Sequence, residues 1–382
     1  MSNRREFLFQ LGAGALGLVG MRLLPGCEHI DVESKLIGGE VDYITDPADG
    51  EWYWQSGNGT AKADAPEIAR EEWSLEIVGD GGLSETIDFG DLQQLADGGE
   101  SMTYIKTMRC VFGTKIGALT DSLVSTGIFT GIPLPTLLDQ FDLPSEANKI
   151  RTFGNDGFES NVPFDRAMMT GSSPLPLLVA YDINGRPMST LRGGPVRLVA
   201  PEMWGYKNMK WLQRLEITSD DSFFGTYETE QFAGNEHQEI IDDPAKIALM
   251  STITKPTAVG QEVEGPNITI AGVSFAGGTA IEGVEVALDD GPFEPFEIES
   301  RQEIRQSLDD DLKPLFDEAE QATGPWPAHD VWVTWAKQFE GVPKGEHAVT
   351  IRASDEIGRR QERETGNRLV TVPRIRVPFT VT

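Results

Sequence analysis

Short apolar runs separated by turn residues dominate the chain from residue 73 to about residue 216. Most of these runs are too short for a helix and indicate strands, whereas PLPTLLDQF has the spacing of a helical face. The mixture predicts an α+β domain, which we place at residues 66–245. The expected strands are SLEIVGD, SMTYIKTMRCV, KIRTFG, LPLLVAYDING, PVRLVAPE and NMKWLQRLEIT.

The C-terminal third has a different pattern, in which apolar and polar residues alternate with period two. Closely spaced strands of this kind predict an all-β sandwich over residues 250–382, with the boundary inside DDPAKIALMSTITKPTAVG. One segment, RQEIRQSLDDDLKPLFDEAEQ, is acidic and predicts an exposed helix or a long loop. The expected strands are NITIAGVSFAGG, IEGVEVALDDG, DVWVTWAKQF, HAVTIRASDEIG and LVTVPRIRVPFTVT.

Residues 1–27 have the pattern of an export signal, in which a basic start precedes a short, Gly-rich apolar run. Arg4 and Arg5 resemble a twin-arginine signal, which exports folded proteins, and LPGC resembles a lipoprotein box ending at Cys27. Lipidation of Cys27 and an uncleaved anchor are both open, and either would hold the chain on the membrane outside the cytoplasm. Residues 28–65 would then form a tether and an arm leading into the first domain.

The chain is strongly acidic, with a formal net charge of −29 and a pI of about 4.4. Such a surface repels nucleic acid and anionic lipid, so neither is an expected partner. Lys supplies only 12 of the 32 basic residues. An acidic, Lys-poor surface is typical of proteins that work in high salt, although an ordinary acidic protein has the same composition.

Several common catalytic motifs are absent from the sequence. The four His residues are scattered, and no HExxH, CxxC, P-loop or GxSxG pattern is present. One GxGxxG match, at Gly12, Gly14 and Gly17, lies inside the export signal and follows no strand. The sequence therefore gives little support for zinc, haem, nicotinamide or flavin chemistry.

Two features remain as candidate chemistry. Cys110 is the one cysteine outside the export signal, and it can be either a small buried apolar residue or a reactive thiol. The segment TLRGGPVRLVAPEMWGYKNMKW brings Arg192, Arg197, Lys207 and Lys210 together with several Gly residues. Such a cluster can bind a phosphate-bearing anion through cations and backbone N–H groups, or it can be a solvated loop paired with carboxylates.

The order of these segments resembles the sulfite oxidase family. The motifs that carry the resemblance are MRC, FTGIPLPTLL, FGNDGF, LLVAYDINGRPM and RGGPVRLVAPEMWGYKNMKWLQRLEI, followed by the C-terminal strands. The resemblance covers about residues 50–380. It implies a molybdopterin-binding domain followed by an immunoglobulin-like dimerisation domain, with a molybdenum–molybdopterin cofactor in the first.

The resemblance also implies roles for individual residues. Cys110 matches the cysteine that ligates molybdenum, and a soft thiolate suits a redox-active metal. Asp156 lies where the family contacts the cofactor, Arg192 replaces a cofactor-binding His or Asn, and Arg197 matches a cofactor-binding Arg. The tripeptide that holds the pterin and its phosphate corresponds to Asn208, Met209 and Lys210.

The sequence departs from sulfite oxidase at two positions. At the first position, sulfite oxidases have an Arg that helps to bind sulfite, whereas this chain has Gln55 near that place, and we expect Gln55 to contact the cofactor. At the second position, Phe232 aligns with the catalytic Tyr of the family, and Tyr227 lies five residues earlier. The stretch WYWQSGNGTAKADAP is closer to the bacterial protein-methionine-sulfoxide reductases. The substrate therefore stays open among sulfite, other small oxyanions and sulfoxides.

The resulting hypothesis is an exported molybdenum oxidoreductase that carries out a two-electron oxo transfer. Electrons would pass to or from a separate partner such as a cytochrome, a cupredoxin or a quinone-linked protein, and a homodimer is possible. Two alternatives stay open: a methionine-sulfoxide-reductase-like activity, and a non-enzymatic tethered β-sandwich protein that binds a partner without a cofactor.

Overall fold

The structure is a computed structural model that describes the chain in segments. The described residues are 42–48, 52–56, 58–110, 124–169, 175–222, 224–226, 247, 249–256, 260–361 and 375–382. The predicted export signal with Cys27, residues 28–41 of the predicted tether, Tyr227 and Phe232 lie outside them.

The N-terminal region is built from one mixed sheet and one antiparallel sheet. The first has the order β2-β1-β10-β5-β6, with only β1 and β10 parallel, and the second has the order β3-β4-β7-β8, with β9 paired to β7. Their bounds are β1 Ser74–Gly79, β2 Leu83–Asp88, β3 Met102–Arg109, β4 Val124–Pro133, β5 Lys149–Gly154, β6 Glu159–Pro163, β7 Leu178–Ile183, β8 Arg186–Pro187, β9 Arg197–Val199 and β10 Leu212–Thr218.

Helices are few and short in this region. Helix α4 (Phe89–Asp97) begins at a capping box, in which Asp88 accepts from the Asp91 backbone and Asp91 accepts from the Asp88 backbone. The predicted helix in PLPTLLDQF is confirmed as α5 (Leu134–Leu138), which buries its Leu side chains. One further turn, α6 (Phe164–Ala167), follows β6. The domain is thus mostly β with few helices, and the predicted α+β mixture is confirmed in part.

The described part of the C-terminal region, predicted as all-β, consists of two sheets together with two helices. A sheet with the order β11-β13-β16 and a sheet with the order β12-β18-β17-β14-β15 share one cluster of buried side chains, which includes Ile270 and Trp335 from the first and Val286 and Ile351 from the second. The bounds are β11 Met250–Lys255, β12 Gln261–Val263, β13 Ile268–Phe275, β14 Ile281–Leu288, β15 Glu294–Phe296, β16 Val333–Phe339, β17 Gly345–Asp355 and β18 Ile375–Val381.

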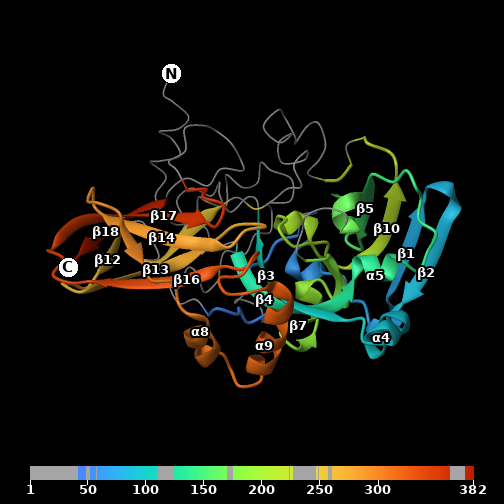
Figure 1. The fold of residues 1–382 in the computed structure, drawn as a ribbon, viewed down its shortest axis with the longest axis horizontal. Coiled ribbons are helices and arrows are strands. Elements are labelled where there is room, and N and C mark those ends of the chain that lie inside the picture. Colours follow the sequence, from blue (N-terminus) through green and yellow to red (C-terminus); the bar gives the residue numbers. More distant parts are fainter. Residues whose placement is uncertain are drawn as a thin grey trace.

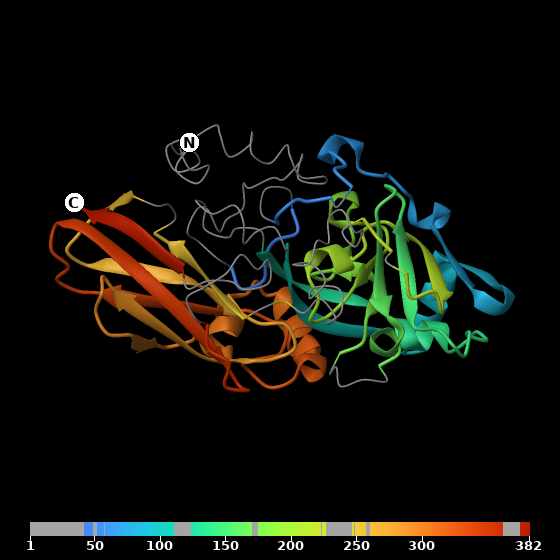
Figure 2. The ribbon, with the colours of Figure 1, turned by 90° about the horizontal axis from the view of Figure 1, so that it is seen from above.

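The acidic segment of the C-terminal region is helical, as one of its two predicted alternatives stated, but it is exposed on one side only. It forms α8 (Arg301–Ser307) and α9 (Leu312–Thr323), which lie below β16, β3 and β4 in Figure 1 and beside the sandwich in Figure 2. Ile304, Phe316 and Ala319 are buried in the main core. The buried sides of the two helices were not predicted, because charges outnumber these few apolar residues in the sequence.

The two regions are joined by backbone and side-chain contacts. Ile247 N–H donates to the Glu202 carbonyl at 2.8 Å, and the Ile247 carbonyl accepts from Gly277 N–H at 2.8 Å. The main core extends from the N-terminal sheets to Phe275 and Trp332 of the C-terminal region. The predicted domain bounds, with a break between residues 245 and 250, stay a prediction.

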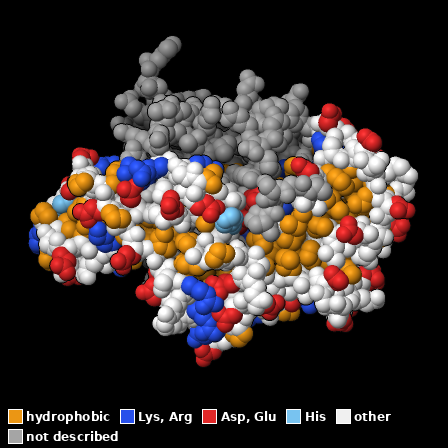
Figure 3. Space-filling model, in the orientation of Figure 1, with side chains coloured by type: hydrophobic (Ala, Val, Ile, Leu, Met, Phe, Trp, Pro, Cys, Tyr) orange, Lys and Arg blue, Asp and Glu red, His pale blue; other side chains and the backbone are white. Residues whose placement is uncertain are grey.

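Within the described residues, no helix is long and apolar enough to cross a membrane. Figure 3 shows Asp and Glu side chains scattered over the visible face of both regions, as the composition predicts.

Candidate functional site

A cavity in the N-terminal region collects nearly all of the predicted site residues. It is formed by the segment 52–56, the end of β3, the turn after β5 and the segment 205–211. Arg192 does not line it. The predicted residues that do are Gln55, Cys110, Asp156, Arg197, Asn208, Met209 and Lys210.

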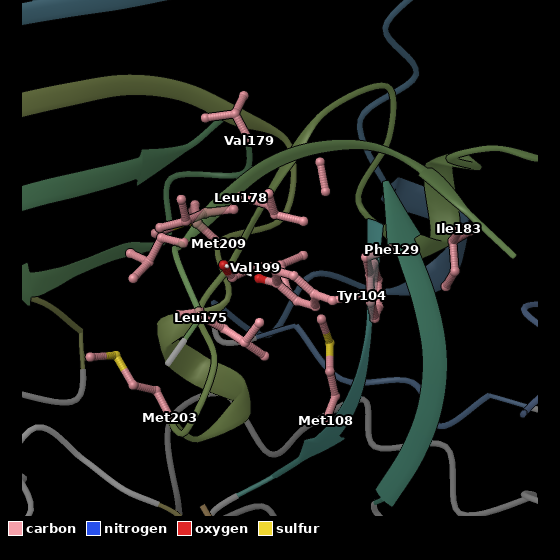
Figure 4. Packing of buried hydrophobic residues seen from close by; sticks show 14 of the residues in the cluster. Tyr104, Met108, Phe129, Leu175, Leu178, Val179, Ile183, Val199, Met203 and Met209 are labelled. Atoms are coloured by element: carbon pink, nitrogen blue, oxygen red, sulfur yellow. Dashed lines mark hydrogen bonds between the residues drawn. The ribbon is translucent and has the colours of Figure 1, made fainter. Parts of the chain in front are cut away.

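The wall of the cavity rests on the main hydrophobic core. The side chains labelled in Figure 4, among them Tyr104 and Met108 of β3 and Val199 of β9, belong to one buried cluster. The Tyr104 hydroxyl donates to the Pro176 carbonyl at 3.0 Å, so its hydrogen-bonding need is met inside the core. The strand that leads to Cys110 is therefore fixed by packing on one face.

Cys110 directly follows β3 and is 5% exposed. Its thiol donates a hydrogen bond to the Gln55 side-chain oxygen. Gln55 also reaches Lys210, because the Lys210 ammonium donates to the Gln55 backbone carbonyl at 2.9 Å. Gln55 thus joins the candidate metal ligand to a candidate phosphate-binding cation, which supports the prediction that it belongs to the site.

Lys210 is held in an aromatic and cationic environment. Its ammonium lies 3.9 Å from the ring centroid of Trp54 and 5.4 Å from that of Trp211. Burial, followed by the charges of Arg192 and Arg197, lowers the pKa of Lys210 well below its usual value. Because Arg192 and Arg197 repel the charged form of Lys210, an anion bound beside these three side chains would be stabilised by all of them.

Arg197 is 3% exposed and points into the same space from β9. One terminal nitrogen donates to the Arg192 carbonyl at 2.7 Å and the other donates to the Asn208 carbonyl at 2.9 Å. Its Nε is buried and has no hydrogen-bond partner among the described residues. Burial lowers the pKa of Arg197 to about 10, with Arg192 lowering it further against the influence of Tyr53.

The tripeptide Asn208–Lys210 is fixed by the strands beside it. The Asn208 side chain accepts from Ala200 N–H at 2.7 Å and donates to the Trp204 carbonyl at 2.9 Å. The Met209 carbonyl accepts from Leu198 N–H at 2.8 Å, and Met209 is 1% exposed. These bonds hold the backbone of the tripeptide rigid at the cavity wall.

Asp156 lines the cavity, but its carboxylate is used by the protein. It accepts from the Ser56 hydroxyl at 2.8 Å, the Thr60 hydroxyl at 3.2 Å and Phe158 N–H at 3.1 Å. The Asp156 carbonyl accepts from the Asn58 side chain at 2.6 Å. Asp156 therefore ties the segment 56–60 to the turn after β5.

Arg192 is 1% exposed and lies behind the cavity wall. It donates to the backbone carbonyls of Trp52 and Tyr53, each at 3.3 Å. Within the described residues it thus positions the wall and adds positive charge near Lys210, and this geometry supports no direct ligand contact.

Two site residues were missed by the sequence reasoning. Tyr53 lines the cavity, and burial and then the charge of Cys110 raise the pKa of its phenol. Arg109 is fully buried beside Cys110, 5.4 Å from the Trp204 ring and 6.0 Å from the Phe275 ring of β13. Burial lowers the pKa of Arg109 to about 9. The aromatic run WYW and the dipeptide RC were the signals available.

Two glycines allow neighbouring groups to approach the backbone of the cavity wall closely. Gly193 has φ of 98°, and a Cβ there would lie 2.8 Å from the Lys210 side chain. A Cβ on Gly205 would lie 2.9 Å from the Arg109 carbonyl and 3.0 Å from the Tyr53 hydroxyl. Larger residues would therefore displace the cation or the phenol.

Known proteins match this chain mainly over the N-terminal region. Residues 62–224 match the model of the oxidoreductase molybdopterin binding domain. The chain is 32% identical over 142 residues to mitochondrial sulfite oxidase of Homo sapiens, covering 35% of this chain and 25% of the human protein. It is 26% identical over 179 residues to inducible nitrate reductase 2 of Glycine max, covering 41% of this chain and 19% of that protein.

A solved structure extends the likeness to both regions. The sulfane dehydrogenase SoxCD from Paracoccus pantotrophus superposes with a TM-score of 0.63 at 18% identity, over 93% of this chain and 85% of that chain. At this identity the match shows a shared fold. The chain spans about a quarter of the length of the human relative.

The fold and the matches define an oxidoreductase molybdopterin-binding domain. Over this domain the chain is similar to the sulfite oxidases, and the resemblance seen in its motifs is confirmed. The family implies a molybdenum–molybdopterin cofactor. The site fits that group: it offers a buried thiol, the buried Arg197 and the half-buried Lys210, whose pKa values are both lowered, and an Arg197 Nε that lacks a hydrogen-bond partner within the described part of the chain.

The described residues contain no group of three or more His, Cys, Asp or Glu that could hold a metal ion. A metal bound by the Cys110 thiolate would therefore take its other ligands from the cofactor or from solvent. A pterin dithiolene is such a source, and this is consistent with the single-cysteine site that the motifs predicted.

Proposed function

We propose that this chain is a molybdenum-cofactor oxidoreductase that carries out a two-electron oxo transfer on a small molecule. The observation that carries the proposal is the Cys110 thiol, which lines one cavity together with Arg197 and Lys210. A thiolate for the metal and cations for a phosphate are the two things that a phosphate-bearing metal cofactor needs.

The residues of the cavity divide the work of binding. Arg197 and Lys210 would neutralise the phosphate of the cofactor, and Asn208 and Met209, whose backbone bonds within the protein, would hold Lys210 at the cavity wall. Cys110 would hold the metal as a thiolate. When bound, molybdenum supplies the two-electron redox chemistry, while the protein supplies position and electrostatics.

The proposed substrate is sulfite or a related small oxyanion or sulfoxide. The names of the matched proteins point to small sulfur and nitrogen compounds: sulfite, nitrate and sulfane. Gln55 near the position of the family's sulfite-binding Arg weakens the attraction for a dianion, so sulfoxides and monoanions stay in the set. The test is steady-state turnover with artificial electron carriers, using sulfite with an acceptor, and methionine sulfoxide or small N-oxides with a donor.

A methionine-sulfoxide-reductase-like activity is the second candidate. It is favoured by Gln55, whose side chain accepts from the Cys110 thiol in the site, and by the KADAP sequence that follows. Turnover of protein-bound methionine sulfoxide, without oxidation of sulfite, would select it. A purified protein that binds neither molybdenum nor pterin would instead favour the non-enzymatic tethered β-sandwich protein.

We further propose that the C-terminal sandwich is an immunoglobulin-like dimerisation domain and that a separate cytochrome, cupredoxin or quinone-linked protein exchanges electrons with the site. Solution mass measurement in high salt tests the homodimer. Export by the twin-arginine route and lipidation of Cys27 are also proposals, and mass spectrometry of the mature N-terminus in the native host tests both.

Replacing Tyr53 by Phe is expected to lower kcat by about tenfold or more, because loss of one buried hydrogen-bond donor costs roughly 1–3 kcal/mol. The phenol lines the cavity beside Cys110, and its removal takes a donor from the space next to the metal ligand. The measurement is kcat with a saturating artificial carrier. Tyr206→Phe, in the same cavity but with its ring 5.2 Å from the Lys207 ammonium, is the matched control and should lose less. Equal losses in both variants would contradict the role given to Tyr53.

The stability of the protein is expected to rise with salt. With a net charge of −29, repulsion among carboxylates is strongest at low ionic strength and is screened as salt increases. The midpoint of thermal unfolding should therefore increase between dilute buffer and molar KCl, and the far-ultraviolet circular dichroism signal reports it. A midpoint that is flat or falls with KCl would argue against the adaptation to high salt that the composition favours.

A further inference from the structure

The strand that leads to Cys110 lies at the edge of its sheet. β3 is the first strand in the order β3-β4-β7-β8, and its whole length pairs with β4 on one side. An edge strand leaves a row of backbone groups that need other partners, and without them its last residues are less firmly held.

The C-terminal region supplies those partners. Ile105 N–H donates to the Thr323 hydroxyl at 3.2 Å, and Thr107 N–H donates to the Asp330 carbonyl at 2.9 Å. These are alternate residues of β3, as expected for the outward side of an edge strand. The same segment returns a bond, because Trp332 N–H donates to the Thr107 hydroxyl at 2.9 Å.

Two buried groups of opposite charge, Lys106 of β3 and Asp330 of the C-terminal region, interact electrostatically. Lys106 is 0% exposed and Asp330 is 2% exposed, and the Asp330 carboxylate accepts from Gly278 N–H at 3.1 Å. Burial lowers the pKa of Lys106 to about 8, and the charge of Asp330 acts against that lowering. Asp330 therefore helps to keep a positive charge inside the protein on the strand that carries Cys110.

Side-chain packing also holds β3, and we call these contacts of the C-terminal region with β3 the clamp. α9 ends at Thr323 and lies against β3, with Phe316 and Ala319 in the core that also holds Tyr104 and Met108. The Trp332 indole is 1% exposed and donates to the Tyr43 carbonyl at 2.9 Å. The C-terminal region is therefore in contact with β3 through main chain, side chain and charge.

We propose that the segment 323–332 of the C-terminal region positions Cys110: by pairing with the edge of β3, it holds the end of that strand in the geometry that the metal requires. Thr323 and Asp330 are positioning residues in this account, because they act on Cys110 through the strand. The metal-ligand role of Cys110 belongs to the proposed function, and the positioning role rests on it.

The test follows the reactivity of the Cys110 thiol in the full-length, cofactor-free chain. A Cys27→Ala background leaves Cys110 as the one thiol, and its rate of reaction with N-ethylmaleimide reports local opening at the end of β3. Thr323→Val removes the acceptor of Ile105 N–H and keeps the shape of the side chain. Asp330→Asn removes the carboxylate charge that acts on Lys106 and is the second test variant.

Two variants of the same region serve as matched controls, because they lose comparable interactions away from β3. Ser274→Ala removes a buried acceptor of the Trp335 indole at 3.0 Å, and Asp355→Asn removes a fully buried carboxylate that binds Arg359 at 2.7 Å. All labelling is done well below the thermal midpoint of each variant, so that global unfolding does not contribute.

The proposal predicts that Thr323→Val and Asp330→Asn each raise the Cys110 labelling rate about tenfold over the controls, as loss of one buried hydrogen bond would. The same variants should retain less molybdenum per chain after gel filtration of the loaded protein. Labelling rates equal to those of Ser274→Ala and Asp355→Asn would overturn the positioning role. Raised labelling in a protein that never binds molybdenum would uphold the role of the segment and sink the proposed function instead.

Discussion

Replacing Cys110 by Ser is expected to lower turnover by more than about 100-fold, since even changes behind a metal ligand cost 10–100-fold in affinity or activity. The hydroxyl is a harder and less acidic donor than the thiol and is a poor substitute as a ligand for a redox-active metal. Because the side chains are nearly isosteric and Cys110 follows a well-packed strand, the thermal midpoint of the cofactor-free protein should change little.

The matched control for this variant is Cys27→Ser, which replaces the other cysteine of the chain by the same residue. Turnover and bound molybdenum should stay at the level of the unaltered protein in that control. Full activity in Cys110→Ser would contradict the assignment of the metal ligand, whatever happens to the substrate question.

Replacing Lys210 by Met is expected to have opposite effects on the loaded and the cofactor-free protein. A charged hydrogen bond contributes about 1.5–3 kcal/mol, so loss of the ammonium should weaken cofactor retention by about 10–100-fold. In the cofactor-free protein, the same ammonium is buried beside Arg192 and Arg197, which lower its pKa. Its removal should therefore raise the unfolding midpoint of that form.

The pH dependence of the cofactor-free protein checks the same point. The folded-state pKa of Lys210 is lower than its unfolded value, so the unfolded chain binds the extra proton between the two values. Stability should then rise with pH across that window, and this rise should be smaller in Lys210→Met. Arg214→Met is the matched control, because this guanidinium lies outside the cavity, 3.2 Å from Glu216. A fall in stability for cofactor-free Lys210→Met would contradict an anion site built from buried cations.

The sequence predicts many strands of this protein, because period-two alternation and turn residues are local signals, but β2, β4 and β6 were not among the predicted strands. β3, β5 and β13 lie inside the runs that predicted them, and Cys110 stands at the end of its strand. The association of Cys110 with Arg197 and Lys210 depends on tertiary structure, and it was reached through the family resemblance. Their shared cavity agrees with it.

Other features depend on partners that are distant in sequence. Arg192 holds the cavity wall because it donates to the carbonyls of Trp52 and Tyr53. These partners are about 140 residues away in the sequence, so the residues around Arg192 do not predict them. The helices α8 and α9 pack inward because β3 offers them an apolar face, while their own composition is charged. Tyr53 enters the site because Gly205 leaves room for its hydroxyl.

The clamp on β3 is the part furthest from sequence reasoning. Thr323 and Asp330 are more than 200 residues from their partners Ile105 and Thr107, and neither belongs to a recognisable motif. Long-range backbone pairing of this kind has no local signature, since any residue can supply a carbonyl.

The central claim is that this chain binds a molybdenum–molybdopterin cofactor through Cys110, and metal and pterin analysis of the protein purified from its native host tests it most directly. The account predicts stoichiometric molybdenum, pterin fluorescence after denaturation, and the loss of molybdenum in Cys110→Ser. Protein that is folded but contains neither molybdenum nor pterin would contradict it.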